Sequence, residues 1–107
     1  MTKTYTVIFK PRAERHLDDL YAYIAERSGE ARADDFVGRI VATCQNLSMF
    51  PERGTKRDDI RPNLRTTSYA RRVMIAFVID HDTDTVAILG VYYGGQEFEQ
   101  ALVEDRD

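Results

Sequence analysis

The longest apolar pattern of the chain runs over residues 64–93 and predicts a β-hairpin. Residues 73–79 and 86–92 form two almost uninterrupted apolar runs. Between them, residues 80–84 read Asp-His-Asp-Thr-Asp, a polar set that is typical of a turn. Because side chains alternate between the two faces of a sheet along each strand, both faces of this hairpin should be covered.

Two amphipathic helices are expected before the hairpin. Apolar residues recur every three or four positions over residues 12–27 and 30–48. Ser28-Gly29 gives a very short connection, so the helices should form an antiparallel pair with Gly29 as a left-handed cap. Phe50 follows the second helix, and we expect it to plug the end of the helical pair.

The remaining segments complete the expected order of elements. Alternating β-branched and aromatic residues predict a first strand over residues 4–10. Residues 64–69 form a weaker strand, residues 70–79 a strong one and residues 86–93 the last one. Residues 55–63 read as an exposed basic loop. Residues 96–103 are expected to form a helical turn or two, and residues 104–107 to fray.

Together these elements predict one α+β domain over residues 1–107. Their order is β-α-α-β-β-β, a small mainly antiparallel sheet with an N-terminal helical hairpin packed on one face. A chain of 107 residues with 43% apolar content suits a single core. The second face of the sheet is left without sufficient cover, so we expect a bound partner segment there, or a homodimer contact.

Composition narrows the cellular setting. No run of about 18 apolar residues exists, so no membrane span is expected. The N-terminus lacks the apolar core and cleavage site of a signal peptide. The single cysteine, Cys44, excludes an internal disulfide, and together these features favour the cytoplasm. Since Cys44 lies on the apolar stripe of its helix, we expect a buried, inert thiol.

Charge is unevenly distributed along the chain. The net charge is −3, yet residues 53–72 carry seven basic residues against two acidic ones. Residues 80–107 carry eight acidic residues against one basic residue. The basic segment that opens into the hairpin could receive an acidic partner peptide, phosphates, or the acidic tail of the chain itself.

No standard catalytic motif and no phosphate-binding glycine loop occurs, and neither a cofactor nor a metal is expected. His81 is predicted to be a solvated turn residue and His16 to lie at the helix surface. Arg65 and Arg72 are more informative because they lie on strands beside apolar runs, and a guanidinium binds carboxylates or phosphates at two points. The alternative is that each pairs with an acidic side chain within the domain.

A set of short motifs occurs in a recognisable order. They are Ala13, Asp18-Asp19-Leu20, Leu47 followed by Pro51 and Gly54, Leu64-Arg65, the strand over 72–77, and Val91-Tyr92-Tyr93-Gly94-Gly95-Gln96-Glu97. Together with the order of elements, they resemble the RelE/ParE toxin superfamily of type II toxin–antitoxin systems. The resemblance covers residues 5–102.

This resemblance implies a cytoplasmic bacterial toxin that a co-encoded antitoxin neutralises. The antitoxin would wrap the toxin with its C-terminal segment and bind the operator with its N-terminal part. A ParD-like partner with a ribbon-helix-helix N-terminus is expected. The residues that we expect to bind it are Arg65, Arg72, Met74, Val78, Leu89 and Tyr93.

Two activities compete within the superfamily. RelE-like members cut messenger RNA on the ribosome without metal, for which Arg65, Arg72 and Tyr93 would be the candidate catalytic residues here. ParE-like members lack the basic cluster and inhibit DNA gyrase. Gln96 stands where an arginine is common, and the C-terminal stretch is acidic. The resemblance therefore favours the ParE-like branch, without enzymatic activity or direct nucleic-acid binding. A degenerate, non-toxic member that only binds its antitoxin is the third alternative.

Overall fold

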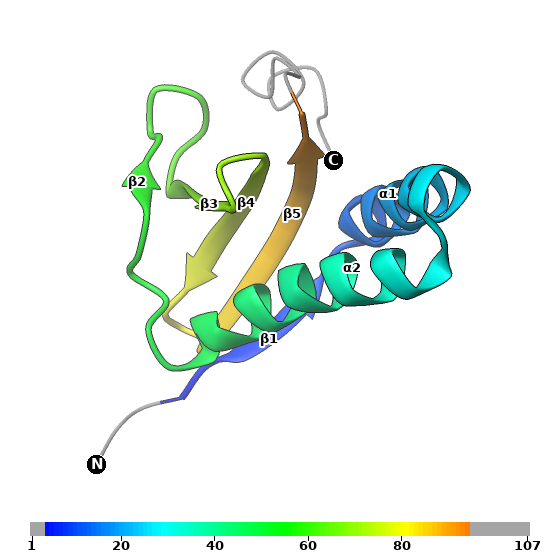
Figure 1. Cartoon of the computed structure of the whole chain (residues 1–107). Coiled ribbons are helices and arrows are strands. Elements are labelled where there is room, and N and C mark those ends of the chain that lie inside the picture. The colour runs from blue at the N-terminus through cyan, green and yellow to red at the C-terminus, as the bar shows by residue number, and fades with distance from the viewer. Residues whose placement is uncertain (1–3, 95–107) are drawn as a thin grey trace.

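The computed structural model of the chain describes residues 4–94, in which two helices lie against one face of a five-stranded sheet (Figure 1). In chain order the elements are β1 (Thr6–Phe9), α1 (Pro11–Ser28), α2 (Glu30–Gln45), the 3-10 turn η1 (Asn46–Ser48), β2 (Thr55–Lys56), β3 (Leu64–Tyr69), β4 (Val73–Asp80) and β5 (Thr85–Tyr93). This confirms the expected α+β fold. The helical turn expected over residues 96–103 and the frayed tail over 104–107 lie outside the described residues.

The strands follow the order β1-β5-β4-β3-β2 across the sheet. β1 pairs in parallel with β5, Thr6 opposite Thr85, and the other neighbours are antiparallel. The first strand of the chain therefore lies beside the last described strand. β2 was not predicted, because its two residues fall in the segment read as an exposed loop.

The boundary of β4 also differs from the prediction. A strand was expected from residue 70, but Ala70 and Arg71 adopt positive φ values of 52° and 60° and form the turn after β3. Residues other than glycine, asparagine and aspartate rarely adopt this conformation, so neither Ala70 nor Arg71 marks a turn in the sequence.

The helices agree closely with the expected ranges. α1 begins at Pro11, where the missing N–H of proline costs no helical hydrogen bond. Gly29 joins the helices with φ 93°, and its N–H donates to the Ala25 carbonyl at 3.0 Å. Within residues 4–94, neither helix is long and apolar enough to cross a membrane.

The prediction for Phe50 is wrong. Its side chain is 56% exposed, with the Arg53 guanidinium carbon 5.4 Å from the centre of its ring. Leu47 and Pro51 are buried on either side of it in the sequence. Leu47, in the 3-10 turn that continues α2, already packs into the core at the end of the helical pair.

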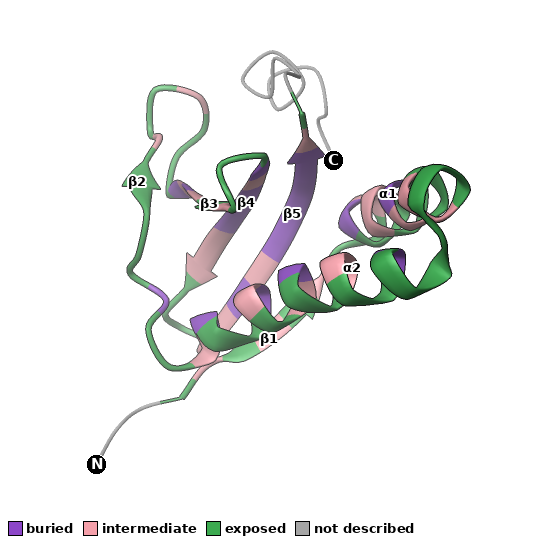
Figure 2. Ribbon diagram, viewed as in Figure 1, coloured by how far each residue is buried: buried purple, intermediate pink, exposed green. Residues whose placement is uncertain are grey.

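The main core lies between the helices and the sheet, where Figure 2 shows the buried residues gathered on β4, β5 and the inner sides of both helices. Phe77 is the largest fully buried side chain. Cys44 is also fully buried, and burial raises the pKa of its thiol to about 12. A thiol of this kind stays protonated at neutral pH, which confirms the expected inert cysteine.

A second apolar cluster covers the face of the sheet that points away from the helices. Leu64, Ala76, Leu89 and Tyr92 are buried there, and Met74, Val78 and Ala87 are half-buried beside them. Ile60, from the loop between β2 and β3, folds onto the same cluster. The second face is thus apolar as expected, but the free chain already buries its centre, so the surface left for a partner is narrower than predicted.

Candidate functional site

A hollow lies where the connection between α1 and α2 approaches the start of β4 and the end of β5. It is a cavity of about 580 Å³. Its walls combine three aromatic side chains, Tyr23, Phe36 and Tyr93, with three cationic ones, Arg27, Arg32 and Arg72. We call this cavity the arginine–aromatic groove.

The aromatic wall is built from three different elements. The rings of Phe36 on α2 and Tyr93 on β5 meet edge to face, with centroids 5.9 Å apart and an interplanar angle of 84°. The ring of Tyr23 on α1 also packs against Tyr93, with centroids 5.9 Å apart. Tyr69 of β3 packs against Phe36 at 5.7 Å. Edge-to-face contacts of this kind are favourable and hold the rings in fixed orientations.

The arginines of the groove are available to an anionic partner. The Arg27 guanidinium carbon lies 3.9 Å from the centre of the Tyr23 ring, in cation–π geometry. Asp35, the acidic residue of the lining, already accepts two hydrogen bonds of 3.2 Å from Arg39. Within residues 4–94, no carboxylate lies within ion-pair distance of Arg32 or Arg72. The alternative that Arg72 pairs with an acidic side chain is therefore not observed in the described part of the chain.

Arg72 also borders a second cavity. This hollow measures about 210 Å³ and is lined by Met74 and Tyr92 of the second face, together with Arg72 itself. The Arg72 carbonyl accepts a hydrogen bond of 2.9 Å from the Gly94 N–H, which ties the turn before β4 to the end of β5. Arg72 thus stands between the second face of the sheet and the arginine–aromatic groove.

The structure brings three of the six predicted antitoxin-binding residues to this end of the molecule. Tyr93 and Arg72 line the groove, and Met74 lines the adjacent cavity. Val78 and Leu89 lie further along the second face. These five residues therefore follow one continuous path from the second face, over the turn before β4, into the groove.

A bulge in β5 decides which of the two neighbouring tyrosines enters the groove. Phe77 of β4 pairs with Ile88, whereas Ala76 pairs with Gly90, so Leu89 is the extra residue. Beyond the bulge, Tyr92 packs on the second face and Tyr93 on the helix side. The expectation that the two tyrosines point in opposite directions is confirmed.

Arg65 lies apart from this path. It pairs with Phe77, five positions along β4 from Arg72, which corresponds to about 17 Å at the rise of a strand. Its Nη1 donates to the Arg53 carbonyl at 3.2 Å. The three candidate catalytic residues of a RelE-like site are consequently not assembled: Arg72 and Tyr93 share the groove, and Arg65 is elsewhere.

His16 has a structural role that the sequence interpretation missed. It was expected at the helix surface, but it is half-buried, and its Nδ1 accepts the Val91 N–H at 3.1 Å. Its ring lies 5.0 Å from that of Tyr92. β1 ends opposite Ile88, so it has no residue that could pair with Val91. The N–H of Val91 is bound instead by the His16 side chain of α1, which lies beside this part of β5. The spacing offered a signal, because position 16 lies three residues after buried Ala13 and four before buried Leu20.

The turn between β4 and β5 has the expected form. Asp80 accepts the N–H groups of Asp82 and Thr83 at 2.9 and 3.2 Å, and these hydrogen bonds lower the pKa of its carboxyl. The Nδ1 of His81 lies 2.9 Å from the Tyr5 hydroxyl. Within the described residues, no group of three or more histidine, cysteine or acidic side chains could hold a metal ion.

Comparison with known proteins places the chain among bacterial toxins. A family model described as the ParE toxin of the type II toxin–antitoxin system parDE matches residues 7–98. No match to a curated protein sequence was found.

Solved structures of toxins share the fold. The chromosomal ParDE system of P. aeruginosa contains a chain 20% identical to this one, with a TM-score of 0.73 over 86% of this chain and 98% of that chain. The RelBE2 toxin–antitoxin complex of Mycobacterium tuberculosis gives 22% identity and a TM-score of 0.60, covering 84% and 98%. A mutant of the E. coli toxin RelE in the free state gives 11% identity and a TM-score of 0.66, covering 96% of this chain and 97% of that chain.

Proposed function

The chain belongs to the ParE toxin family of type II toxin–antitoxin systems, and from this premise we propose that it acts in the bacterial cytoplasm by binding and inhibiting DNA gyrase. The observation that supports binding over RNA cleavage is the separation of Arg65 from Arg72 and Tyr93. A cognate antitoxin would hold the toxin inactive until it is released.

The chemistry of RNA cleavage explains why the separation of Arg65 from Arg72 and Tyr93 argues against a nuclease. A general base and a general acid must both reach the same ribose and phosphate, each within hydrogen-bond distance. Arginine stays protonated in proteins, so Arg72 could stabilise charge but not transfer the proton. Tyr93 would remain as the one proton-transfer group of the candidate set in the groove, while Arg65 is about 17 Å away along the sheet.

Supercoiling assays with purified gyrase test the proposal. We expect the full chain to inhibit supercoiling, and Arg65→Ala to leave both inhibition and growth arrest unchanged. A RelE-like nuclease would instead cut messenger RNA on ribosomes and would lose about 100-fold or more in rate on Tyr93→Phe, since a general acid–base group contributes that much. No inhibition at a large molar excess of toxin contradicts the gyrase proposal.

The RelE-like activity remains the second candidate because Arg72 and Tyr93 do share one groove. Under that mechanism, Arg72 would neutralise a phosphate and Tyr93 would transfer the proton. Expression without antitoxin separates both active forms from a degenerate member, since only an active toxin arrests growth.

We further propose that the antitoxin follows the path over Arg72. Its C-terminal segment would place apolar side chains on Met74, Val78 and Leu89, cross the turn before β4, and enter the arginine–aromatic groove beside Tyr93. Acidic residues in that segment would complement the cationic groove. A ParD-like protein with a ribbon-helix-helix N-terminus is the partner that the family suggests.

Charge reversal at Arg72 tests this path. We expect Arg72→Glu to weaken the toxin–antitoxin complex by about 2–4 kcal/mol, roughly 30- to 700-fold, because it leaves a partner carboxylate facing a like charge. Arg65→Glu is the matched control on the same hairpin and should change the dissociation constant by less than about threefold. Isothermal titration with the purified antitoxin measures both. Equal losses in the two variants would mean that the antitoxin also covers the end of the sheet near Arg65.

A further inference from the structure

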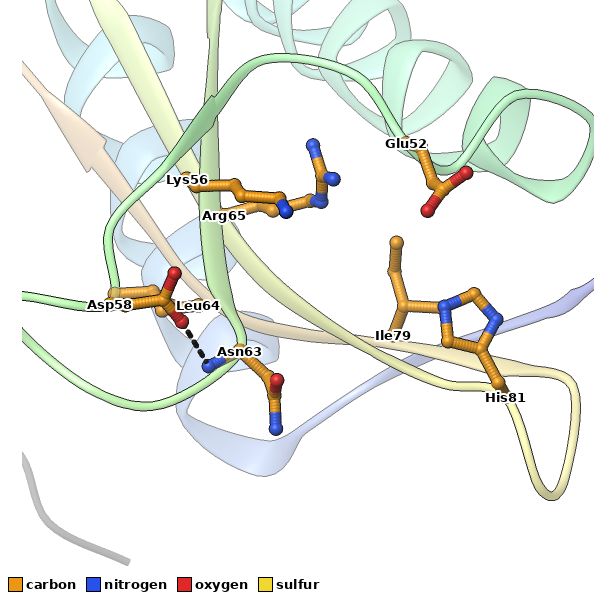
Figure 3. A pocket seen from close by; sticks show the side chains of 8 residues that line it. All are labelled: Glu52, Lys56, Asp58, Asn63, Leu64, Arg65, Ile79 and His81. Carbon is orange, nitrogen blue, oxygen red and sulfur yellow. Dashed lines mark hydrogen bonds between the residues drawn. The ribbon is translucent and has the colours of Figure 1, made fainter.

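A second polar pocket lies at the opposite end of β3 from the groove. It is a cavity of about 160 Å³ bounded by β2, β3 and the turn after β4. In Figure 3 the cationic head groups of Lys56 and Arg65 lie side by side on one side of it, and Glu52 and His81 lie on the other. None of these four residues belongs to the path proposed for the antitoxin.

The two cations are direct neighbours across the sheet. Lys56 pairs with Arg65 in the register of β2 and β3, which places their Cβ atoms about 4.5–5.5 Å apart. Like charges in this arrangement repel each other. In the described part of the chain, no carboxylate lies within ion-pair distance of either side chain. An anion bound between them would remove the repulsion.

The backbone fixes where both cationic side chains begin, and one hydrogen bond holds the Arg65 head group. Gly54 adopts φ 72° and packs directly against the Thr66 carbonyl, so the segment before β2 lies tightly on β3. This approach brings the Arg53 carbonyl to 3.2 Å from Arg65 Nη1. That bond holds the guanidinium with one of its five N–H groups and leaves others for a ligand.

His81 lines the far side of the pocket. Its Nδ1 lies 2.9 Å from the Tyr5 hydroxyl, and the two rings meet edge to face with centroids 5.8 Å apart. With the Tyr5 hydroxyl as donor to Nδ1, the proton of the neutral imidazole lies on Nε2. Figure 3 shows the second ring nitrogen turned toward the pocket.

Glu52 determines which anion fits. Asp58 also lines the pocket, but its Oδ1 already accepts the Asn63 N–H at 2.9 Å. The Glu52 carboxylate is an acceptor and repels an anion that has no hydrogen to donate. A ligand must therefore offer acceptor oxygens to Lys56 and Arg65 and an O–H to Glu52. A phosphate group that keeps one proton at neutral pH meets both conditions, whereas sulfate and phosphodiesters have no such proton.

We propose that this pocket binds inorganic phosphate, which keeps at least one proton at neutral pH. A phosphate monoester, with a second pKa of about 6, has mostly lost its last proton at the same pH. The site is independent of the gyrase and antitoxin proposals, because it uses neither the groove nor the second face.

Titration of the isotope-labelled full chain with sodium phosphate, followed by NMR of the backbone N–H groups at constant ionic strength, tests the proposal. Saturable shifts at Lys56 and Arg65 are expected, with phosphate binding at least about tenfold tighter than sulfate. Arg65→Gln and Lys56→Gln should each weaken phosphate binding about tenfold or more. Arg72→Gln removes an equal charge at the other end of the hairpin and should leave phosphate binding within about twofold. Each variant must retain the wild-type spectrum outside its own site.

Glu52→Gln supplies the decisive comparison. The amide no longer repels sulfate, and its NH₂ can donate to it, so the preference for phosphate over sulfate should fall to about twofold or less. A nucleoside monophosphate has mostly lost its last phosphate proton at neutral pH and should bind more weakly than inorganic phosphate; equal or tighter binding of the monophosphate would contradict the role given to Glu52. Equal binding of phosphate and sulfate by the unmodified chain overturns the proposal. The proposal is also overturned if Arg72→Gln and Arg65→Gln lose equal phosphate affinity, because the loss would then reflect only a general attraction of the anion to positive charge.

Discussion

Replacement of Gly54 by alanine is expected to lower the free energy of unfolding by about 2–5 kcal/mol. Gly54 has φ 72°, a conformation that costs a residue with a side chain about 1–2 kcal/mol. An added Cβ would also collide with the Thr66 carbonyl and lie 3.1 Å from the Cβ of Thr67. Since the colliding group is backbone of β3, relief requires β2 to move away from the sheet.

Gly29→Ala is the matched control for this effect. Gly29 also has a positive φ, 93°, but no atom lies within 4 Å of the position its Cβ would take. Its replacement should cost about 1–2 kcal/mol, the conformational part alone. Urea unfolding of both variants measures the difference. Equal losses would contradict the close approach of Gly54 to β3, and with it the fixed position of Lys56 beside Arg65.

Phe77→Ala is expected to destabilise the fold by about 3–5 kcal/mol. Phe77 is 0% exposed and faces the helices from β4, next to the strand that carries Tyr93. Removal of its ring takes apolar surface out of the core and leaves a cavity that a sheet held on both sides cannot fill by collapse. Chemical denaturation should show a lower midpoint, with the slope of the transition unchanged.

Val78→Ala provides the comparison for Phe77. Val78 is the next residue of β4, is half-buried, and lies on the second face. Its truncation should cost about 1 kcal/mol and should weaken antitoxin binding, because the proposed path crosses it. If Val78→Ala were as destabilising as Phe77→Ala, the second face would be a complete core in the free chain. The path proposed for the antitoxin would then have to be abandoned.

The helices and the main hairpin were predictable because their signals are local. Apolar spacing placed α1 and α2 almost to the residue, and the polar run at residues 80–84 marked the turn before β5. The parallel pairing of β1 with β5 was not predictable, since nothing in four residues specifies a partner that lies so far along the chain. The turn at Ala70 and Arg71 was missed for the opposite reason: its residues carry no local turn preference.

The site could be predicted only in part. Arg72 was identified because an unpaired arginine is unfavourable beside an apolar run, and Tyr93 because one of two neighbouring tyrosines at a strand end was free to line a groove. The groove itself depends on Tyr23 and Phe36, whose positions relative to Tyr93 follow from tertiary packing. The bulge at Leu89 decides whether Tyr92 or Tyr93 enters the groove. The simple alternation of side chains along a strand does not predict where such a bulge occurs. Arg65 resembled Arg72 in sequence context and differs from it only in three-dimensional position.

The pairing of β1 with β5 also sets the order of events while the chain is being made. Thr6–Phe9 leave the ribosome early, yet their partners Thr85–Ile88 are translated roughly 80 codons later. At about 5–20 residues per second, β1 waits for roughly 4–16 s before it can join the sheet. The groove, which needs Tyr93, forms at the same late stage. Until then the nascent toxin cannot present the groove that we propose the antitoxin enters.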